Sequence, residues 1–482
     1  MARKASITLE NLMELGPEKL AQLVLGEAER DAAFRKRVST ALAAKKGPES
    51  VAKIIDRRLA ALEKARSFID WDKARAFRDD LAATVATTAD ELGTAAPVMA
   101  VDRLVRFIAT HESVFERVDD SSGRIQDVYD QAIADAGALT SNLPQDEKAL
   151  LPEKIMAALG DTSHGYLVDA ARVVIEHLPA DVLRNWEAEL ARLQEDQEAE
   201  DRRSKDRYIF SSARQYHDIR QIIADNLGDL DGLIALEENK HPNLQDTIGI
   251  AERLLEAGRH KEALDWVRRD QPGGLKVMTV ADLADGLKPR LVSSSRRTSL
   301  EATIFDALGQ KSQALSLRWS AFETTLDADM LREYVNALPD FEEFDALDRA
   351  FGHVLSSDRI YSALAFFMEW PRLDLAAKKV LAHRGEWDGG QYDLLRSAAD
   401  HLLQDHALAA TILYRALIDD ILDRARSKAY PHAVRYLKKL DALAAASDTD
   451  ATCVEGVVTH ADYRAGLQKK HGRKMSFWAR VN

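Results

Sequence analysis

The stretch LLEAGRHKEAL at residues 254–264 and the stretch ALGQKSQAL at residues 307–315 share the pattern that decides the fold. In each stretch a run with helical spacing reaches a glycine, Gly258 or Gly309, and an Ala-Leu pair begins five residues later. A glycine at a helix end readily takes the left-handed conformation that closes the last turn, and a small residue early in the next helix lets the two helices pack closely. Both stretches therefore predict helical hairpins of the tetratricopeptide type.

These two hairpins do not belong to a regular array. Positions 258 and 309 are 51 residues apart, whereas a tetratricopeptide repeat has a period of about 34 residues. A third match, LLQDHALAA at residues 402–410, lacks the glycine. We therefore expect a helical-hairpin solenoid with irregular tetratricopeptide-like repeats and insertions in the C-terminal half.

The composition extends the helical prediction to the whole chain. Its 482 residues include only 23 Gly and 12 Pro, while 46% are hydrophobic and 30% are charged. Few turn-forming residues and few β-branched runs favour helices with short connections over sandwiches, barrels and propellers. We therefore expect an all-α fold.

A long run without Gly or Pro, residues 180–226, divides the chain. Its middle, EAELARLQEDQEAEDRRSKDR, is so rich in charge that we expect a solvated helix between two packed regions. The sequence thus predicts an N-terminal helical domain over residues 1–205, a hinge or linker helix region over 206–245, and a tetratricopeptide-like helical repeat domain over 246–482.

The charge balance is acidic overall and basic at the C-terminal end. The formal net charge of −13 opposes non-specific binding to phosphate backbones, but residues 421–482 contain more Lys and Arg than Asp and Glu. The single cysteine, Cys453, excludes an intramolecular disulfide and a multi-cysteine zinc site. No secretory signal and no apolar run of about 18 residues is visible, so we expect a cytoplasmic protein without a membrane partner.

The segment FERVDDSSGRIQDVY at residues 115–129 contains a cluster of carboxylates and hydroxyls. A calcium-binding EF-hand would need carboxylates where Val118 and Tyr129 stand, so the spacing excludes calcium. We favour a loop between helices in which a serine caps the next helix, and a carboxylate–hydroxyl site is the alternative. The candidate residues of this polar loop are Asp119, Asp120, Ser121, Ser122 and Arg124.

The C-terminal helices are predicted to present a basic face to a partner. Lys and Arg alternate there with Tyr, Phe and Trp, a composition that can bind single-stranded nucleic acid by stacking and phosphate contacts. We favour a terminal capping hairpin, in which the rings pack inward beneath the Lys and Arg side chains. The candidate residues of this face are Arg424, Arg426, Lys428, Arg435, Lys438, Lys439, Lys469, Lys470, Arg473 and Lys474.

No sequence motif indicates catalysis or cofactor binding. The glycine-rich phosphate loops and the H-E-x-x-H zinc motif are absent. Ser50 and Lys53 match the S-x-x-K nucleophile pattern, but the S-D-N and K-T-G motifs that accompany it are missing. We therefore expect no cofactor and no metal. Whether the protein is an enzyme stays open, with the negative answer favoured, because a site can assemble from dispersed residues such as Asp119, Asp120 and Arg124.

Five segments carry a resemblance to a known family: residues 66–71 (RSFIDW), 113–129, 413–418 (LYRALI), 426–430 (RSKAY) and 471–478 (HGRKMSFW). They resemble an uncharacterised all-helical family of bacterial, frequently proteobacterial, proteins that is defined only as a domain of unknown function. The resemblance covers nearly the whole chain. The C-terminal half is also similar to the helical region of bacterial SWIM zinc-finger proteins. Because the Cys-x-Cys and Cys-x-His ligands of a SWIM finger are absent, that second resemblance implies only the helical scaffold.

Together these features predict a cytoplasmic protein–protein interaction scaffold. A solenoid of helix pairs has a concave face that binds a peptide or helix of another protein, and it is also compatible with a homo-oligomer. Nucleic-acid binding through the basic C-terminal helices is the first alternative, and an enzyme with a dispersed site is the second. Exposed apolar side chains would favour peptide binding, whereas a continuous basic stripe would favour nucleic acid.

Overall fold

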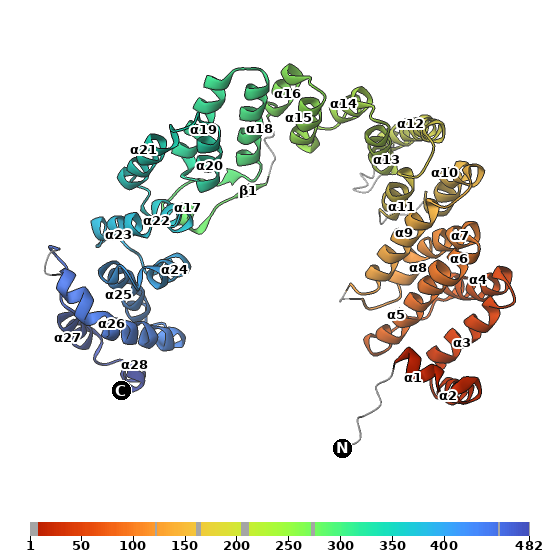
Figure 1. The fold of residues 1–482 in the computed structure, drawn as a ribbon, viewed down its shortest axis with the longest axis horizontal. Coiled ribbons are helices and arrows are strands. Elements are labelled where there is room, and N and C mark those ends of the chain that lie inside the picture. Colours follow the sequence, from red (N-terminus) through yellow and green to blue (C-terminus); the bar gives the residue numbers. More distant parts are fainter. Residues whose placement is uncertain are drawn as a thin grey trace. The chain divides into compact units, whose positions relative to one another are not determined.

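The computed structural model describes residues 8–120, 123–160, 165–203, 212–270, 275–451 and 454–481. This part of the chain is almost entirely helical, and its strands form one short antiparallel ribbon (Figure 1). The predicted all-α fold is therefore confirmed. No helix within the described ranges has both the length and the apolar character that crossing a membrane requires. Contacts divide the chain into Met1–Asn239, here called unit 1, and Lys240–Asn482, here called unit 2.

Unit 1 consists of helices joined by short connections. In chain order these are α1 (Leu9–Met13), α2 (Gly16–Arg30), α3 (Ala32–Ala44), α4 (Pro48–Lys64), α5 (Trp71–Ala86), the π-helix η1 (Thr87–Leu92), α6 (Gly93–Ala95), α7 (Pro97–Ile108), α8 (His111–Phe115), α9 (Gln126–Thr140), α10 (Gln145–Leu159), α11 (Tyr166–Ile175), α12 (Ala180–Arg203), α13 (Ser212–Leu227) and α14 (Leu230–Glu238).

The core of unit 1 includes the contacts of α7 with α4 and α9. Leu59 of α4, Leu104 and Phe107 of α7, and Tyr129 of α9 are almost fully buried. The rings of Phe107 and Tyr129 stack with their centroids 4.7 Å apart. Burial of each such side chain contributes roughly 1.5–3 kcal/mol, so this cluster stabilises the packing of the three helices.

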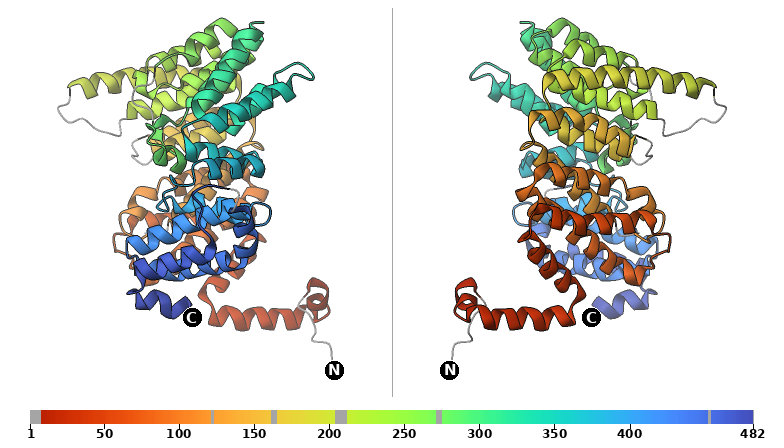
Figure 2. Two further views of the ribbon diagram at one scale, coloured as in Figure 1. Left: turned by 90° about the vertical axis from the view of Figure 1, so that its left-hand side faces the viewer. Right: turned by 90° about the vertical axis from the view of Figure 1, so that its right-hand side faces the viewer.

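The amino-terminal helices α1 and α2 extend away from the packed helices of unit 1 (Figure 2). Helix α1 has no buried residue, and Ala28 is the buried residue of α2. These two helices therefore contribute little to the core.

The charged helix α12 is packed on one side over its first half. Leu183, Trp186 and Leu190 are buried, and α12 packs along α13, which also contacts α11. Within the charged middle, for which the sequence predicted a solvated helix between two packed regions, Leu190 is buried and the other described residues are half-buried or exposed. The helix belongs to unit 1 and does not separate the two units. The division between the units falls after Asn239, inside the stretch 206–245.

Unit 2 contains the remaining helices and the two strands. In chain order these are the 3-10 helix η2 (Pro242–Leu244), α15 (Thr247–Glu256), α16 (His260–Val267), β1 (Lys276–Val277), α17 (Val280–Ala284), β2 (Arg290–Leu291), α18 (Ser294–Ala307), α19 (Lys311–Thr325), α20 (Ala328–Asn336), α21 (Glu343–Ser356), α22 (Ile360–Glu369), α23 (Leu373–Ala382), α24 (Tyr392–Leu402), α25 (Ala407–Asp423), the 3-10 helix η3 (Ser427–Ala429), α26 (Tyr430–Ala451), α27 (His460–His471) and α28 (Met475–Val481).

Helices α15 and α16 pack together, as do α18 and α19, and each pair is joined at a glycine that the sequence identifies. Gly258 and Gly309 have φ values of +74° and +75°. The N–H of the residue after each glycine donates to the carbonyl five residues earlier, at 2.8 and 2.9 Å, which is the Schellman arrangement. Ala263 and Ala314 are fully buried where the second helix of each pair begins. The predicted glycine turns are therefore present.

Between these two hairpins the chain forms an additional module, residues 275–292, which we call the insertion. It consists of β1, α17 and β2. The strands are antiparallel, with Lys276 opposite Leu291 and Val277 opposite Arg290. This module accounts for part of the 51-residue spacing between the two glycines.

Helix α25 is the centre of the C-terminal part of unit 2. It packs against α23, α24 and α26, and most of its residues are buried. Tyr414 of α25 stacks on Tyr436 of α26 with the ring centroids 5.5 Å apart. A helix that is apolar on most sides requires neighbours on most sides, and the sequence of α25, ALAATILYRALIDDILD, has this property.

Candidate functional site

The predicted polar loop joins α8 to α9, and Asp119 and Asp120 form hydrogen bonds there through the backbone and the side chain, respectively. Oδ2 of Asp120 accepts hydrogen bonds from the N–H of Ile125 at 2.8 Å and of Gln126 at 3.4 Å, where α9 begins. The N–H of Asp119 donates to the carbonyl oxygen of Ile69 at 3.4 Å. A carboxylate at this position satisfies free N–H groups and favours the positive end of the helix dipole.

The remaining predicted residues of this loop are Ser121, Ser122 and Arg124. Ser121 and Ser122 lie outside the described residues. Arg124 is exposed and lines a pocket of about 260 Å³ together with Trp71 and Arg75 of α5. Within the described ranges, neither Arg124 nor Arg75 has an ion-pair partner. The loop thus combines a capping carboxylate with a solvent-facing cation.

Part of the predicted basic C-terminal face is neutralised by neighbouring carboxylates. Four of the ten residues form ion pairs within unit 2, namely Arg424 and Arg426 with Asp420, Lys439 with Asp400, and Lys470 with Asp423. The other six have no ion-pair partner in the part of the chain that the structure describes: Lys428, Arg435, Lys438, Lys469, Arg473 and Lys474. The face therefore has less unpaired charge than the sequence suggests.

The aromatic rings that alternate with these cations pack against the protein. Tyr430, Tyr436 and Phe477 are buried. Trp478 is half-buried and donates from its indole N–H to the carbonyl oxygen of His471 at 3.0 Å. Base stacking on aromatic side chains requires an accessible ring face, which the three buried rings do not provide.

Exposed apolar side chains are concentrated in two parts of the chain, the amino-terminal helices α1 and α2 and the insertion. Leu275 is 77% exposed and Leu283 is 59% exposed. The large hydrophobic residues with high exposure in this module are Leu275, Val277, Met278, Val280, Leu283 and Val292. Scattered exposed apolar residues are ordinary, but a concentration of them marks an interaction site.

The pairing of β1 with β2 places three of these side chains on one face of the ribbon. Residues two positions apart on a strand share a face, and so do residues directly opposite each other. Val277 lies opposite Arg290, and two residues further along the same register the N–H of Val292 donates to the carbonyl oxygen of Leu275 at 2.9 Å. Leu275, Val277 and Val292 therefore share a face with Arg290.

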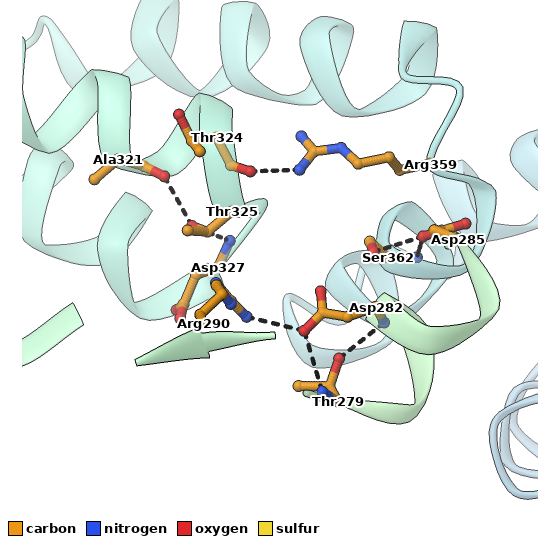
Figure 3. Close-up of polar contacts among 10 residues, drawn as sticks. All are labelled: Thr279, Asp282, Asp285, Arg290, Ala321, Thr324, Thr325, Asp327, Arg359 and Ser362. Carbon is orange, nitrogen blue, oxygen red and sulfur yellow. Dashed lines mark hydrogen bonds and ion pairs between the residues drawn. The ribbon is translucent and has the colours of Figure 1, made fainter. Parts of the chain in front are cut away.

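Helix α17 is held to this face of the ribbon by an ion pair. The side chains and backbone N–H groups of Thr279 and Asp282 exchange hydrogen bonds of 3.0 and 3.1 Å, which form a capping box. The Asp282 carboxylate also accepts from Nη2 of Arg290 at 3.2 Å (Figure 3). Val280 and Leu283 are three positions apart on α17, so they are neighbours on its exposed side.

Asp285 fixes the insertion to the core of unit 2. Its carboxylate accepts a hydrogen bond from the N–H of Tyr361 at 3.0 Å. It also accepts from the N–H and Oγ of Ser362 at 2.7 and 2.6 Å (Figure 3). These N–H groups belong to the first turn of α22, whose donors have no partner within their own helix. The insertion is therefore attached through these polar contacts and through Ala281, which is buried in the core of unit 2, while its large apolar side chains remain exposed.

The helix ends beside this attachment are also satisfied. Arg359, which precedes α22, donates from Nη2 to the carbonyl oxygen of Glu323 at 2.7 Å and from Nη1 to that of Thr324 at 2.5 Å. Asp327 accepts from the N–H of Asp329 at 2.9 Å, at the start of α20. The carbonyl end of α19 and the N–H end of α20 thus have side-chain partners. Figure 3 shows the bond from Arg359 to Thr324.

The exposed charge on the insertion is positive. Asp282 pairs with Arg290, and the half-buried Asp285 accepts hydrogen bonds from neutral groups of α22. The ammonium groups of Lys276 and Lys288 are exposed and have no acceptor among the described residues. The exposed apolar side chains are therefore accompanied by two free cations.

Sequence reasoning did not identify this surface. The 51-residue spacing of Gly258 and Gly309 indicated an insertion, and the segment LKVMTV at residues 275–280 has strand-like composition. Apolar residues in such a segment are ordinarily assigned to a core, and only the folded arrangement shows that these are exposed.

The fold and the surface define an all-helical protein that presents an apolar insertion to solvent. Among the residues described, no group of three or more His, Cys, Asp or Glu side chains is placed to hold a metal ion. The chain belongs to DUF6880, a family of unknown function whose model matches residues 2–480. None of the curated proteins matches the chain. The expected membership of an uncharacterised family that covers nearly the whole chain is confirmed.

Proposed function

We propose that the protein is a cytoplasmic interaction scaffold, built from irregular helical hairpins, that binds an extended segment of a partner protein at the insertion. The observation that carries this proposal is the concentration of exposed apolar side chains on a module whose carboxylates bond inward. Burial of apolar surface stabilises a complex by roughly 25 cal/mol per Å² before the cost of association.

The ribbon supports an extended partner segment because each of its strands has a free edge. Leu275 and Val292 form a hydrogen-bonded pair, so the next residue on each strand, Lys276 or Leu291, directs its backbone N–H and C=O away from the ribbon. Neither residue has a further backbone hydrogen bond in the part of the chain described. An extended segment can pair with such an edge and place alternate side chains against the apolar face.

The free cations support an acidic partner segment. Lys276 lies within β1, and Lys288 lies two residues before β2. A segment in which apolar and acidic residues alternate would bury the former against Leu275 and Val277 and place the latter near the ammonium groups. Complementary charge raises the association rate and selects the partner, while apolar burial supplies most of the affinity.

Fluorescence polarisation with two labelled ten-residue peptides tests the proposal. One peptide alternates Val with Glu and the other alternates Val with Lys, and both are titrated with the full chain at low and high salt. We expect the acidic peptide to bind with a Kd below about 100 μM and the basic peptide to bind at least about tenfold more weakly.

Two double variants and a matched control assign the binding to the insertion. L275D with L283D is expected to abolish binding of the acidic peptide, and K276E with K288E is expected to reverse the preference between the peptides. Met475, which is 75% exposed on α28, provides the control, since M475D places the same charge on a distant apolar residue.

Three results would count against the proposal. The first is equal binding of both peptides, and the second is an unchanged preference after the lysine reversal. The third is loss of self-association, rather than of peptide binding, in L275D with L283D, which would identify a second copy of the chain as the occupant.

Nucleic-acid binding, the alternative function, predicts a different experimental result. Salt-dependent binding of a labelled single strand that is lost on reversing Lys428, Arg435, Lys438 and Lys469, with no binding of either peptide, would support the C-terminal basic face instead.

A further inference from the structure

A polar cavity of about 560 Å³ lies in unit 2, separate from the insertion. It is bounded by α25, by Tyr463 near the start of α27, and by two loop segments, residues 384–389 and 456–458. Arg415 and Asp419 on α25 line this cavity. They are four positions apart, so they occupy neighbouring places on one face of the helix.

Arg415 is almost buried but is only partly satisfied. It is 9% exposed, and its Nη1 donates to the carbonyl oxygen of Val458 at 2.9 Å. Its guanidinium also lies over the ring of Tyr463, with Cζ 4.7 Å from the ring centroid. Nε is buried and has no hydrogen-bond partner among the described residues. Burial lowers the pKa of Arg415, but a guanidinium remains charged in proteins.

Asp419 is half-buried and has a neutral partner. Its Oδ1 accepts a hydrogen bond from the hydroxyl of Tyr463 at 2.9 Å. No cation lies within ion-pair distance of its carboxylate in the described ranges, and Arg415 is not paired with it. Burial raises the pKa of Asp419, although the Tyr463 hydrogen bond acts in the opposite direction.

The other carboxylates at the cavity differ, because each has a cation. Asp420 pairs with Nε of Arg424 at 2.7 Å. Asp423 pairs with Nζ of Lys470 at 2.6 Å. Arg384 also lines the cavity and has no ion-pair partner among the described residues, but its side chain is exposed. Arg415 and Asp419 are therefore the two unpaired charges at the cavity that are buried or half-buried.

Two opposite charges that share a cavity without pairing are an unfavourable arrangement. Each has lost part of its hydration, and neither receives the compensation that an ion pair provides. A ligand with a carboxylate near Arg415 and an ammonium near Asp419 would compensate both charges at once. A ligand with a single charge would compensate only one.

The walls of the cavity indicate what the rest of the ligand is. Trp387, Ile412 and Val457 contribute apolar surface. The chain at Gly389 passes so close to α25 that a Cβ there would lie 2.1 Å from the carbonyl oxygen of Ala416. This wall is therefore backbone, and the space beyond the charged pair suits an apolar side chain.

We propose that this cavity binds a free α-amino acid with an apolar side chain, its carboxylate at Arg415 and its ammonium at Asp419. The site does not depend on the insertion, so it adds a small-molecule ligand to the proposed scaffold function. Its failure would leave the peptide-binding proposal intact.

Isothermal titration calorimetry of the full chain with leucine, phenylalanine and glycine at pH 7 is the primary test. Each amino acid is compared with its amide, which lacks the carboxylate, and with its N-acetyl derivative, which lacks the ammonium. We expect leucine or phenylalanine to bind with a Kd below about 1 mM and each derivative to bind at least about tenfold more weakly.

Substitutions assign the two ends of the ligand. D419N should weaken leucine about tenfold and leave the affinity of N-acetyl-leucine unchanged, because that derivative has no ammonium to lose. R415Q should weaken leucine and leave leucine amide unchanged. D423N is the matched control, since the Asp423 carboxylate already has Lys470 as its partner, and its leucine affinity should stay within about threefold of that of the parent.

The proposal is overturned if none of the three amino acids binds below about 10 mM. It is also overturned if the amide and the N-acetyl derivative bind as tightly as the amino acid, or if D423N weakens leucine as strongly as D419N does. If the circular dichroism spectrum shows that R415Q does not fold, the measurements on D419N and on the amide and N-acetyl derivatives decide the outcome.

Discussion

The insertion and the α25 cavity distribute polar and apolar groups in opposite ways. In the insertion, Asp282 and Asp285 bond to the protein while apolar side chains such as Leu275 face solvent. In the cavity, Arg415 and Asp419 lie beside both charged and apolar lining residues and lack an ion-pair partner among the described residues. The comparison teaches that exposed apolar side chains and partly buried unpaired charges are typical of two different kinds of binding site. Exposed apolar surface is matched by another protein, whereas partly buried unpaired charge is matched by a small charged molecule.

The largest effect is expected from closing the cavity wall with G389A. A Cβ at this position would meet the Ala416 carbonyl oxygen at 2.1 Å, so the loop or α25 must move. Overpacking of this kind costs about 2–3 kcal/mol, measured as the change in the free energy of unfolding in urea. G385A is the control, because nothing lies within 4 Å of a Cβ at Gly385. Equal free energies of unfolding for G389A and G385A would show that the chain around Gly389 can move to accommodate a Cβ.

The second effect is expected from detaching the insertion with D285A. This change leaves the N–H groups of Tyr361 and Ser362 without their acceptor, which costs about 2 kcal/mol. Hydrogen exchange should then accelerate over residues 275–292. D285N retains one carbonyl oxygen and should lose less stability. If D285A and D285N were equally stable, the attachment of the insertion would not depend on this carboxylate.

D419N is expected to change stability by a smaller amount and in the opposite direction, so that the Tm rises. Because burial raises the pKa of Asp419 above that of the unfolded chain, the fold favours the protonated form and ionisation weakens it. The neighbouring charged and titratable groups are Tyr463, Asp423, Lys470 and Arg415. The Tm of D419N should therefore exceed that of the parent at pH 8, and the difference should disappear as the pH falls below the unfolded pKa of the carboxyl group. A lower Tm at pH 8 would contradict the unpaired state of Asp419.

The smallest effect on stability is expected at the exposed side of the insertion. V280S with L283S should change the free energy of unfolding by no more than about 0.5 kcal/mol, because both side chains are exposed. The buried contrast is L331S in α20, which should cost at least about 2 kcal/mol. A large loss in the exposed double variant would mean that these side chains belong to the core rather than to a binding surface.

Sequence alone predicted the parts of the fold that depend on local chemistry. The helical hairpins at Gly258 and Gly309 followed from a glycine and a small residue a few positions apart. The buried face of α12 was missed because Trp186 and Leu190 precede a run of charges, and their burial depends on contacts with α13.

The candidate sites were harder to predict because they depend on distant contacts. Arg415 and Asp419 have the spacing at which opposite charges on a helix usually pair. That they do not pair follows from Val458 and Tyr463, more than 40 residues further along the chain. The exposure of Leu275 likewise depends on how Asp285 attaches the insertion to α22, which local sequence does not report.

Asp285 attaches the insertion to α22, and it is not one of the residues that form the exposed apolar surface of the insertion. Substitutions at Leu275, Val277, Leu283 or Val292 alter the exposed surface and leave the contacts that position it unchanged. Under the proposed function, partner preference can therefore diverge between related chains by single substitutions, each nearly neutral for folding. The same property makes the insertion a convenient place to introduce a new binding sequence by design.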